Sequence, residues 1–164
     1  MQAYHRYTWD RRRGGWKALN FLIDIGLCRD VHSFFGELFV GDLTLHFPDF
    51  PSPEEVIQIS RRANAVPIWA HPGGSLRGVE MPEADRVLAH MVEVGLAGIE
   101  CYSYHHDEEW TRRCLAWAER YDLLVTGGSD SHGGFAGREL GRPEIYMSDL
   151  RLGELTRRLY HRSS

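Results

Sequence analysis

The sequence predicts an α/β protein in which parallel strands alternate with helices. Three short apolar runs, each followed by a turn of glycine or polar residues, are typical of buried strands: residues 66–70, 97–101 and 123–126. Segments with helical periodicity separate these runs, a spacing characteristic of βαβ units. The carboxyl ends of parallel strands are where α/β enzymes place their chemistry, so the turns after these runs are the first place to look for a site.

Residues 1–50 are expected to form a small helical module. Apolar residues recur at helical spacing over residues 16–23, and this helix is expected to end near Gly26. Asp30 is a candidate N-cap for a second helix over residues 31–38. A series of prolines, Pro48, Pro51 and Pro53, then marks a boundary, so the β/α region is expected to span residues 51–164.

The β/α region begins with a strong helix start, Ser52-Pro53-Glu54-Glu55. Serine is a good N-cap, proline suits the first helical position, and the acids complement the helix dipole. Val56, Ile59 and Ala63 are expected to form the buried side of this helix.

Later helices have equally clear limits. One opens at Pro82 and stops at Gly95, and another is capped by Asp107 and continues to Tyr121. A short fourth strand is expected over residues 144–147, followed by a helix that Ser148 caps and that continues through Leu155 and Leu159.

Composition narrows the class of protein. The chain has 164 residues, 43% of them hydrophobic, and a formal net charge of −4 at pH 7, so it has no basic field for nonspecific nucleic-acid binding. Its three widely spaced cysteines fit neither a disulfide framework nor a zinc ribbon. No apolar run is long enough to span a membrane and no signal peptide is evident, so we expect a cytoplasmic protein.

Metal-type ligands follow two of the predicted strands. Asp130 and His132 lie in Gly128-Ser129-Asp130-Ser131-His132-Gly133, directly after the strand over 123–126, and His71 follows the strand over 66–70. A carboxylate oxygen and imidazole nitrogens together suit zinc, manganese or iron. The small residues around Asp130 allow the backbone to come close to a ligand.

The strand over 97–101 leads to a third group of polar residues. Glu100 lies within the strand, where a charge needs a partner or a cavity. His105 and His106 are adjacent, so they are expected to point in opposite directions, with one of them facing the site. Arg77 follows the His71 turn, and its planar guanidinium suits a phosphate group.

These residues together carry a resemblance to a known family. Ala70-His71-Pro72-Gly73, Gly98-Ile99-Glu100-Cys101-Tyr102-Ser103 with His106, and Ser129-Asp130-Ser131-His132-Gly133 resemble, in this order, the C-terminal half of the PHP (polymerase and histidinol phosphatase) family. Similarity is greatest to its small bacterial metal-dependent phosphoesterases. The helical module around residues 14–35 resembles the insertion that these enzymes carry before their His-Pro strand.

The resemblance implies a fold, a chemistry and roles for individual residues. It implies the C-terminal portion of a distorted (β/α)7 barrel that hydrolyses phosphate esters, of nucleotides or sugars among others, at a cluster of divalent ions: zinc, manganese or iron. On this basis His71, Asp130 and His132 are metal ligands, and His106 is the catalytic group that binds phosphate or protonates the leaving oxygen. The resemblance also places His106 and Glu100 on the substrate side, where Arg77 and His105 are further candidates for substrate binding.

The family pattern is incomplete in this chain. The family begins with an Asp-x-His-x-His strand, and the only early histidine here, His5, has no second histidine two residues on. We therefore expect half of a barrel, with unpaired sheet edges that favour a homo-oligomer or a partner chain supplying the N-terminal half. The isolated chain is expected to be weak or inactive. Alternatives are a non-catalytic remnant that binds a partner and, less favoured, a metal-dependent amide or ester hydrolase.

Overall fold

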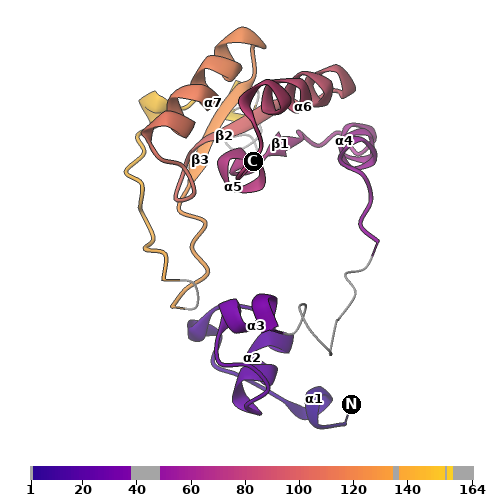
Figure 1. Ribbon diagram of the computed structural model, residues 1–164, viewed down its shortest axis with the longest axis vertical. Helices are drawn as coiled ribbons and strands as arrows, with labels where there is room; N and C mark the ends of the chain where they lie inside the picture. The colour runs from indigo at the N-terminus through magenta and orange to yellow at the C-terminus, as the bar shows by residue number, and fades with distance from the viewer. Residues whose placement is uncertain (1, 38–48, 135–136, 154, 157–164) are drawn as a thin grey trace, which may run out of the picture. The chain divides into compact units, whose positions relative to one another are not determined.

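The computed structural model describes residues 2–37, 49–134, 137–153 and 155–156. They form two compact units: Met1–Phe50 with Asp130–Leu140, and Pro51–Ser129 with Gly141–Ser164. The ribbon of each unit is shown in Figure 1. Each unit is described below by itself.

The first unit is built from short helices. Their bounds are α1 Gln2–Arg6, the 3₁₀ turn η1 Arg11–Arg13, α2 Lys17–Asp24 and α3 Val31–Glu37. Leu19 and Cys28 are buried at the centre, with partly buried apolar side chains of α2 and α3 around them. The predicted helical character is confirmed here, although Leu38 and the boundary at Pro48 lie outside the described residues.

Two contacts fix the loops of this unit. The Arg13 guanidinium binds both carboxylate oxygens of Asp24 at 2.9 and 3.0 Å, and this pairing holds the pKa of Asp24 below its usual range. Gly14 lies so close to His132 that a Cβ at Gly14 would stand 1.6 Å from the His132 carbonyl oxygen, and its φ is +72°. Only glycine fits this position, for steric reasons as well as conformational ones.

Three parallel strands form the sheet of the second unit in the part of the chain that the structure describes. They are β1 Ile68–Trp69, β2 Gly98–Ser103 and β3 Leu124–Gly128, in the order β1-β2-β3. In β2, Ile99, Cys101 and Ser103 are buried while Glu100 and Tyr102 are half-buried. This alternation places one face of β2 in the core and directs Glu100 to the other face.

Helices connect and cover the strands. Their bounds are α4 Pro53–Arg62, α5 Pro72–Ser75, α6 Met81–Val94 and α7 Glu108–Arg120, with a 3₁₀ turn, η2, at Met147–Asp149. Figure 1 shows α7 over β2 and β3, with α6 beside it. The predicted caps are confirmed: Ser52 and Glu55 form a capping box, and the Asp107 side chain accepts from the Trp110 amide.

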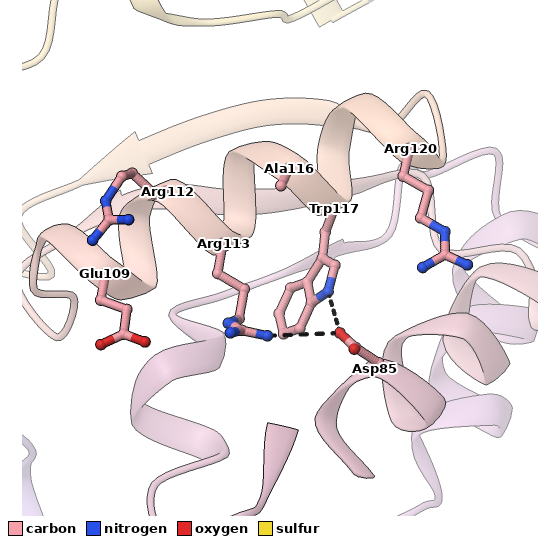
Figure 2. A pocket seen from close by; sticks show the side chains of 7 residues that line it. All are labelled: Asp85, Glu109, Arg112, Arg113, Ala116, Trp117 and Arg120. Atoms are coloured by element: carbon pink, nitrogen blue, oxygen red, sulfur yellow. Dashed lines mark hydrogen bonds and ion pairs between the residues drawn. The ribbon is translucent and has the colours of Figure 1, made fainter. Parts of the chain in front are cut away.

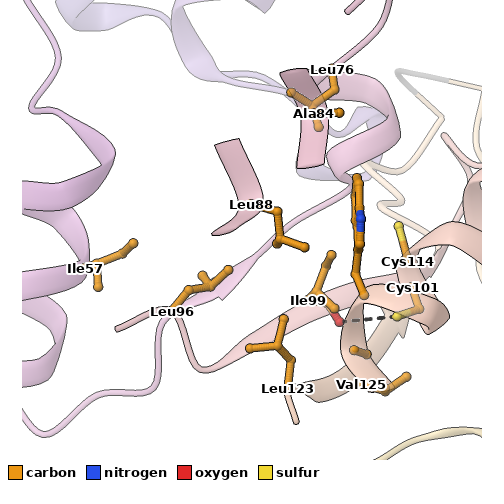
Figure 3. Packing of buried hydrophobic residues seen from close by; sticks show 12 residues of the cluster. Ile57, Leu76, Ala84, Leu88, Leu96, Ile99, Cys101, Cys114, Leu123 and Val125 are labelled. Atoms are coloured by element: carbon orange, nitrogen blue, oxygen red, sulfur yellow. Dashed lines mark hydrogen bonds between the residues drawn. The ribbon is translucent and has the colours of Figure 1, made fainter. Parts of the chain in front are cut away.

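The core of this unit lies between the helices and the sheet. Leu88, Ile99, Cys101 and Cys114 have no exposed surface, and Trp117 is 4% exposed. Figure 3 shows Leu88, Ile99, Cys101 and Cys114 within this cluster, to which Leu96 and Leu123 also belong. The α/β class predicted from the sequence is therefore confirmed.

The predicted strands differ from the observed ones at their limits. The first is only two residues long, since Pro67 has no N–H to donate to a ladder and His71 adopts a left-handed conformation. The predicted fourth strand over 144–147 is wrong. Tyr146 N–H donates to the Asp149 carboxylate and Asp149 N–H to the Tyr146 carbonyl, which closes the turn η2 instead.

The expected C-terminal helix is also not capped by Ser148, which lies within η2. Leu155 and the residue after it are helical, and Leu159 lies outside the described residues. Instead of a fourth strand, an isolated antiparallel bridge pairs Val125 of β3 with Arg151. The Arg151 side chain reinforces this bridge by donating to the Leu123 carbonyl.

The buried side of α4 was wrongly predicted. Ile57 is the α4 residue that packs into the core, at 4% exposure, while Val56 and Ile59 are 46% and 53% exposed. The sequence offers apolar side chains on two sides of this helix. Packing of α4 against α6 selects the side that carries Ile57.

A shallow hollow of about 490 Å³ lies on the outer side of α6 and α7 (Figure 2). At its base the Trp117 indole N–H donates to Asp85 at 2.7 Å, a contact that ties the two helices together. None of its lining residues is a predicted site residue. No helix within the described ranges is long and apolar enough to cross a bilayer.

Candidate metal centre at the strand ends

The candidate site lies where the three strands end. His71 follows β1, Tyr104-His105-His106 follows β2, and Asp130 is the second residue after β3. Ser103 at the end of β2 is paired in register with Gly128 at the end of β3. A register shift between Glu100 and Tyr102 marks a bulge, a feature that re-aims side chains near functional sites.

His71 is held in an unusual backbone conformation. Its φ and ψ are +33° and +60°, in the left-handed region that side chains other than glycine seldom adopt. The Glu100 carboxylate accepts from the His71 N–H at 2.7 Å. Glu100, predicted to need a partner within the sheet, thus has a main-chain N–H as its partner and fixes the start of the His71 turn.

His105 and His106 point in different directions, as expected of adjacent residues. The ring of His105 lies 4.8 Å from that of His71, centroid to centroid, at a tilt of 49°. His106 turns instead towards Gly73, Cys101 and Trp110. Of the two adjacent histidines, His105 is therefore the one that meets His71.

The His106 ring is engaged at both nitrogens. Nε2 accepts from the Gly73 N–H at 3.0 Å, and Nδ1 lies 2.8 Å from the Cys101 carbonyl oxygen. Burial lowers the pKa of His106 below its usual value, against the opposing effects of the Cys101 carbonyl and the Glu100 charge. The catalytic role predicted for His106 stays a prediction, and it has to be reconciled with these two bonds.

A single residue, Ser129, separates Asp130 from the end of β3, so Asp130 directly follows the carboxyl end of this strand. His71, His105 and Asp130, each of which follows one of the three strands, offer one ligand atom apiece to a metal ion. Two imidazole nitrogens and a carboxylate oxygen form a donor set that suits zinc, manganese or iron and leaves a coordination position open. The residues present therefore fit a divalent ion.

Asp130 is also paired within its own loop. The Arg138 guanidinium binds its carboxylate and donates to its main-chain carbonyl at 3.2 Å. The φ of Asp130 is +47°, and the side chains of Asp130 and Arg138 are 25% and 20% exposed. Like His71, Asp130 is a potential ligand held in a left-handed conformation, and such strained residues concentrate at functional sites.

The remaining predicted site residues, His132 and Arg77, are not members of this group. His132 Nδ1 lies 2.7 Å from the Asp130 carbonyl oxygen, and its ring meets Trp16 edge to face at 6.3 Å. The group of three ligand atoms found among the described residues includes His105, not His132. Arg77 is exposed in the turn after α5. Their predicted roles as ligand and phosphate contact stay predictions.

Sequence reasoning placed His105 on the substrate side and did not single it out as a ligand. No local pattern distinguishes it from His106, since both follow β2 and both are half-buried. The distinction depends on the turn after Ser103, which sets the direction of each ring. The positive φ of Asp130 similarly interrupts the extended backbone on which Asp130 and His132 would project to the same side.

Comparison with known proteins agrees with the predicted resemblance. No family model matches the chain. A phosphoribosyl 1,2-cyclic phosphate 1,2-diphosphodiesterase of Eggerthella lenta is 33% identical over 87 residues, which are 53% of this chain and 30% of that protein. A solved structure from Bifidobacterium adolescentis, assigned as a metal-dependent phosphoesterase, has a TM-score of 0.63 and 30% identity.

The structural match to the Bifidobacterium protein covers 80% of this chain and 45% of that one. An amidohydrolase of Chromobacterium violaceum, solved with bound sulfate and no metal, matches at a TM-score of 0.58 over 71% of this chain and 40% of its own, with 23% identity, and so shares the fold. This chain thus spans less than half the length of each relative. The predicted resemblance to part of a PHP-type metal-dependent phosphoesterase is confirmed.

Proposed function

We propose that this chain contributes the strand-end part of a PHP-type phosphoesterase site, in which His71, His105 and Asp130 hold a divalent cation. The observation that carries the proposal is that a potential metal ligand follows each of three successive parallel strands, whose carboxyl ends share one edge of the sheet. The similarity to a diphosphodiesterase and to a protein assigned as a metal-dependent phosphoesterase supports it independently.

The fold is proposed to be the C-terminal portion of a distorted (β/α)7 barrel. The three-stranded parallel sheet, with Glu100 and Tyr102 on the face of β2 opposite the buried one, supports this reading. In a closed barrel that face is the interior. The remaining strands would come from an N-terminal half, either on a partner chain or in a longer form of this one.

A bound divalent cation would lower the pKa of a water molecule and neutralise charge on a phosphoryl group. The chain's own residues then divide the remaining tasks. Glu100 fixes the His71 turn through the His71 N–H, and His132 is proposed to hold a second cation once further ligands are supplied. Arg77, exposed beside this turn, is proposed to contact a phosphate oxygen of the substrate.

The substrate is proposed to be a phosphate ester of a sugar or nucleotide. The named substrate of the Eggerthella relative, a phosphoribosyl cyclic phosphate, belongs to this class. Because the sequence contains no Asp-x-His-x-His motif of the kind that opens the family pattern, the chain alone is expected to turn over slowly. Loss of a single ligand or its supporting group commonly costs about 10–100-fold in affinity or activity.

The test measures both metal binding and hydrolysis. Metal binding is measured by titrating the chain with zinc and with manganese. Hydrolysis is measured with p-nitrophenyl phosphate, bis(p-nitrophenyl) phosphate and p-nitrophenyl acetate, in the presence and absence of the N-terminal half of a PHP-type barrel. We expect zinc binding by the chain, weak phosphate-ester hydrolysis alone and a metal-dependent gain with the half. The Asp130→Asn variant should lose zinc binding.

A matched control is Asp122→Asn. Asp122 has a φ of +51°, close to that of Asp130, but its side chain is 97% exposed. It should bind zinc as the unaltered chain does. Hydrolysis of p-nitrophenyl acetate but of neither phosphate ester would favour an amide or ester hydrolase. Absence of zinc binding, together with no gain in phosphate-ester hydrolysis when the N-terminal half is added, would favour the non-catalytic remnant. Either result would overturn the proposal.

A further inference from the structure

We infer that His106 is a positioning residue that clamps the His71-Pro72-Gly73 turn to the end of β2 and so sets the direction of the His71 side chain. The inference rests on the proposed role of His71 as a metal ligand. It assigns to His106 a structural task at the site in place of proton transfer.

The partners of His106 settle the protonation of its ring. A main-chain N–H can only donate, so Nε2, which bonds to the Gly73 N–H at 3.0 Å, must be the acceptor. A carbonyl can only accept, so Nδ1, 2.8 Å from the Cys101 oxygen, must carry the proton. The ring is therefore neutral, protonated at Nδ1, and uses both nitrogens within the chain.

The packing around the ring fits this role. The Trp110 ring lies nearly parallel to that of His106, at 24° and 6.3 Å between centroids. A Cβ on Gly73 would stand 2.6 Å from His106 Cδ2 and 2.9 Å from the Trp110 ring. Glycine at position 73 is thus what allows the turn to reach the imidazole and be held there.

The clamp acts two residues from His71. On one side of the turn, Glu100 accepts from the His71 N–H, and on the other, His106 accepts from the Gly73 N–H. Both holding groups belong to β2 or the turn directly after it. The strained φ of His71, +33°, is therefore maintained by one hydrogen bond to β2 and one to the turn that follows it. Groups that orient ligands in this way contribute strongly to metal affinity.

The first experiment determines the tautomer of His106. Long-range ¹H–¹⁵N spectra of the full chain, labelled at histidine, report which ring nitrogen is protonated, and the His106→Gln variant identifies the His106 signals. We expect the neutral Nδ1–H form, unchanged when zinc is added, while the signals of His71 and His105 shift. A proton at Nε2, or zinc bound to the His106 nitrogens, would overturn the clamp.

The second experiment measures zinc affinity by competition with a fluorescent chelator. His106→Ala removes both bonds and is expected to weaken zinc binding about 10–100-fold. In His106→Gln the side-chain carbonyl can still accept from Gly73, so a smaller loss is expected. The control is His90→Gln, whose histidine pairs with Glu54 at the surface and should bind zinc normally.

The outcomes separate this inference from the proposed function. Equal zinc affinity in His106→Ala and the unaltered chain would overturn the positioning role while leaving the metal site intact. Absence of zinc binding by the unaltered chain would overturn the proposed metal site itself. Partial recovery in His106→Gln relative to His106→Ala would support the bond to Gly73 as the one that matters.

Discussion

Arg138 binds the carboxylate of Asp130 and, through the same guanidinium nitrogen, the main-chain carbonyl of that residue. The pair is only a quarter exposed or less, so water screens it weakly. A cation arriving at Asp130 meets a carboxylate that already has a positive partner. Arg138 therefore competes with the proposed divalent ion for the Asp130 carboxylate.

Replacing Arg138 with methionine is expected to raise zinc affinity by about tenfold, equivalent to about 1.4 kcal/mol, because the carboxylate no longer has to leave a guanidinium. Arg138→Lys retains the charge and should change affinity less. The measurement is a zinc titration with a chelator in competition. Weaker binding in Arg138→Met would show instead that Arg138 organises Asp130 for the metal.

His105 and His132 provide a direct comparison of two ligand sets. The ring of His105 lies beside that of His71, whereas the family resemblance implies His132 as the further ligand. We expect His105→Ala to lower zinc affinity at least tenfold and His132→Ala to lower it by less than about threefold. Equilibrium dialysis with elemental analysis of both variants checks this, and the reverse order would restore the resemblance-based set.

Gly73→Ala is expected to destabilise the fold by about 1–3 kcal/mol, since the added methyl group meets the rings of His106 and Trp110. Urea unfolding followed by circular dichroism gives the change in free energy. Gly36→Ala is the matched control, because a Cβ there meets nothing within 4 Å and alanine is the better helix former. An unchanged urea midpoint for Gly73→Ala would show that the turn can move to accommodate the added methyl group without loss of stability.

Cys101 and Cys114 are expected to resist thiol reagents in the folded protein. Burial raises the pKa of Cys101 to about 12 and that of Cys114 further, so at pH 8 only about one Cys101 thiol in ten thousand is ionised. Reaction with Ellman's reagent should require urea, with Cys28→Ser used to remove the third thiol. Prompt labelling of two thiols without urea would contradict the described packing.

Association of the chain is expected to involve α4. Val56 and Ile59 are 46% and 53% exposed on a helix whose other side is buried, and within the described residues β1 pairs with β2 alone. A double Val56→Ser, Ile59→Ser variant should shift the molecular mass measured by light scattering towards the monomer. Gln58→Ser on the same helix is the control. A monomeric unaltered chain at every concentration would exclude the predicted homo-oligomer.

Features of this protein that depend on local chemistry could be predicted from the residues alone. The caps at Ser52 and Asp107 and the stop at Gly95 follow from side chains that satisfy nearby main-chain groups. The α/β class follows from the alternation of apolar runs and amphipathic segments. The strand-end location of His71 and Asp130 follows as well, because parallel strands bring their carboxyl ends to one edge.

Which way individual side chains point depends mainly on packing between elements that are distant in the sequence. Which side of α4 is buried was settled by packing against α6, since apolar residues occur on both sides. The opposite orientations of His105 and His106 were foreseen, but only the turn after Ser103 determines which of them reaches His71. A residue in a left-handed conformation, such as Asp130, breaks the periodicity from which side-chain direction is predicted, and in the folded loop Asp130 is bonded to Arg138.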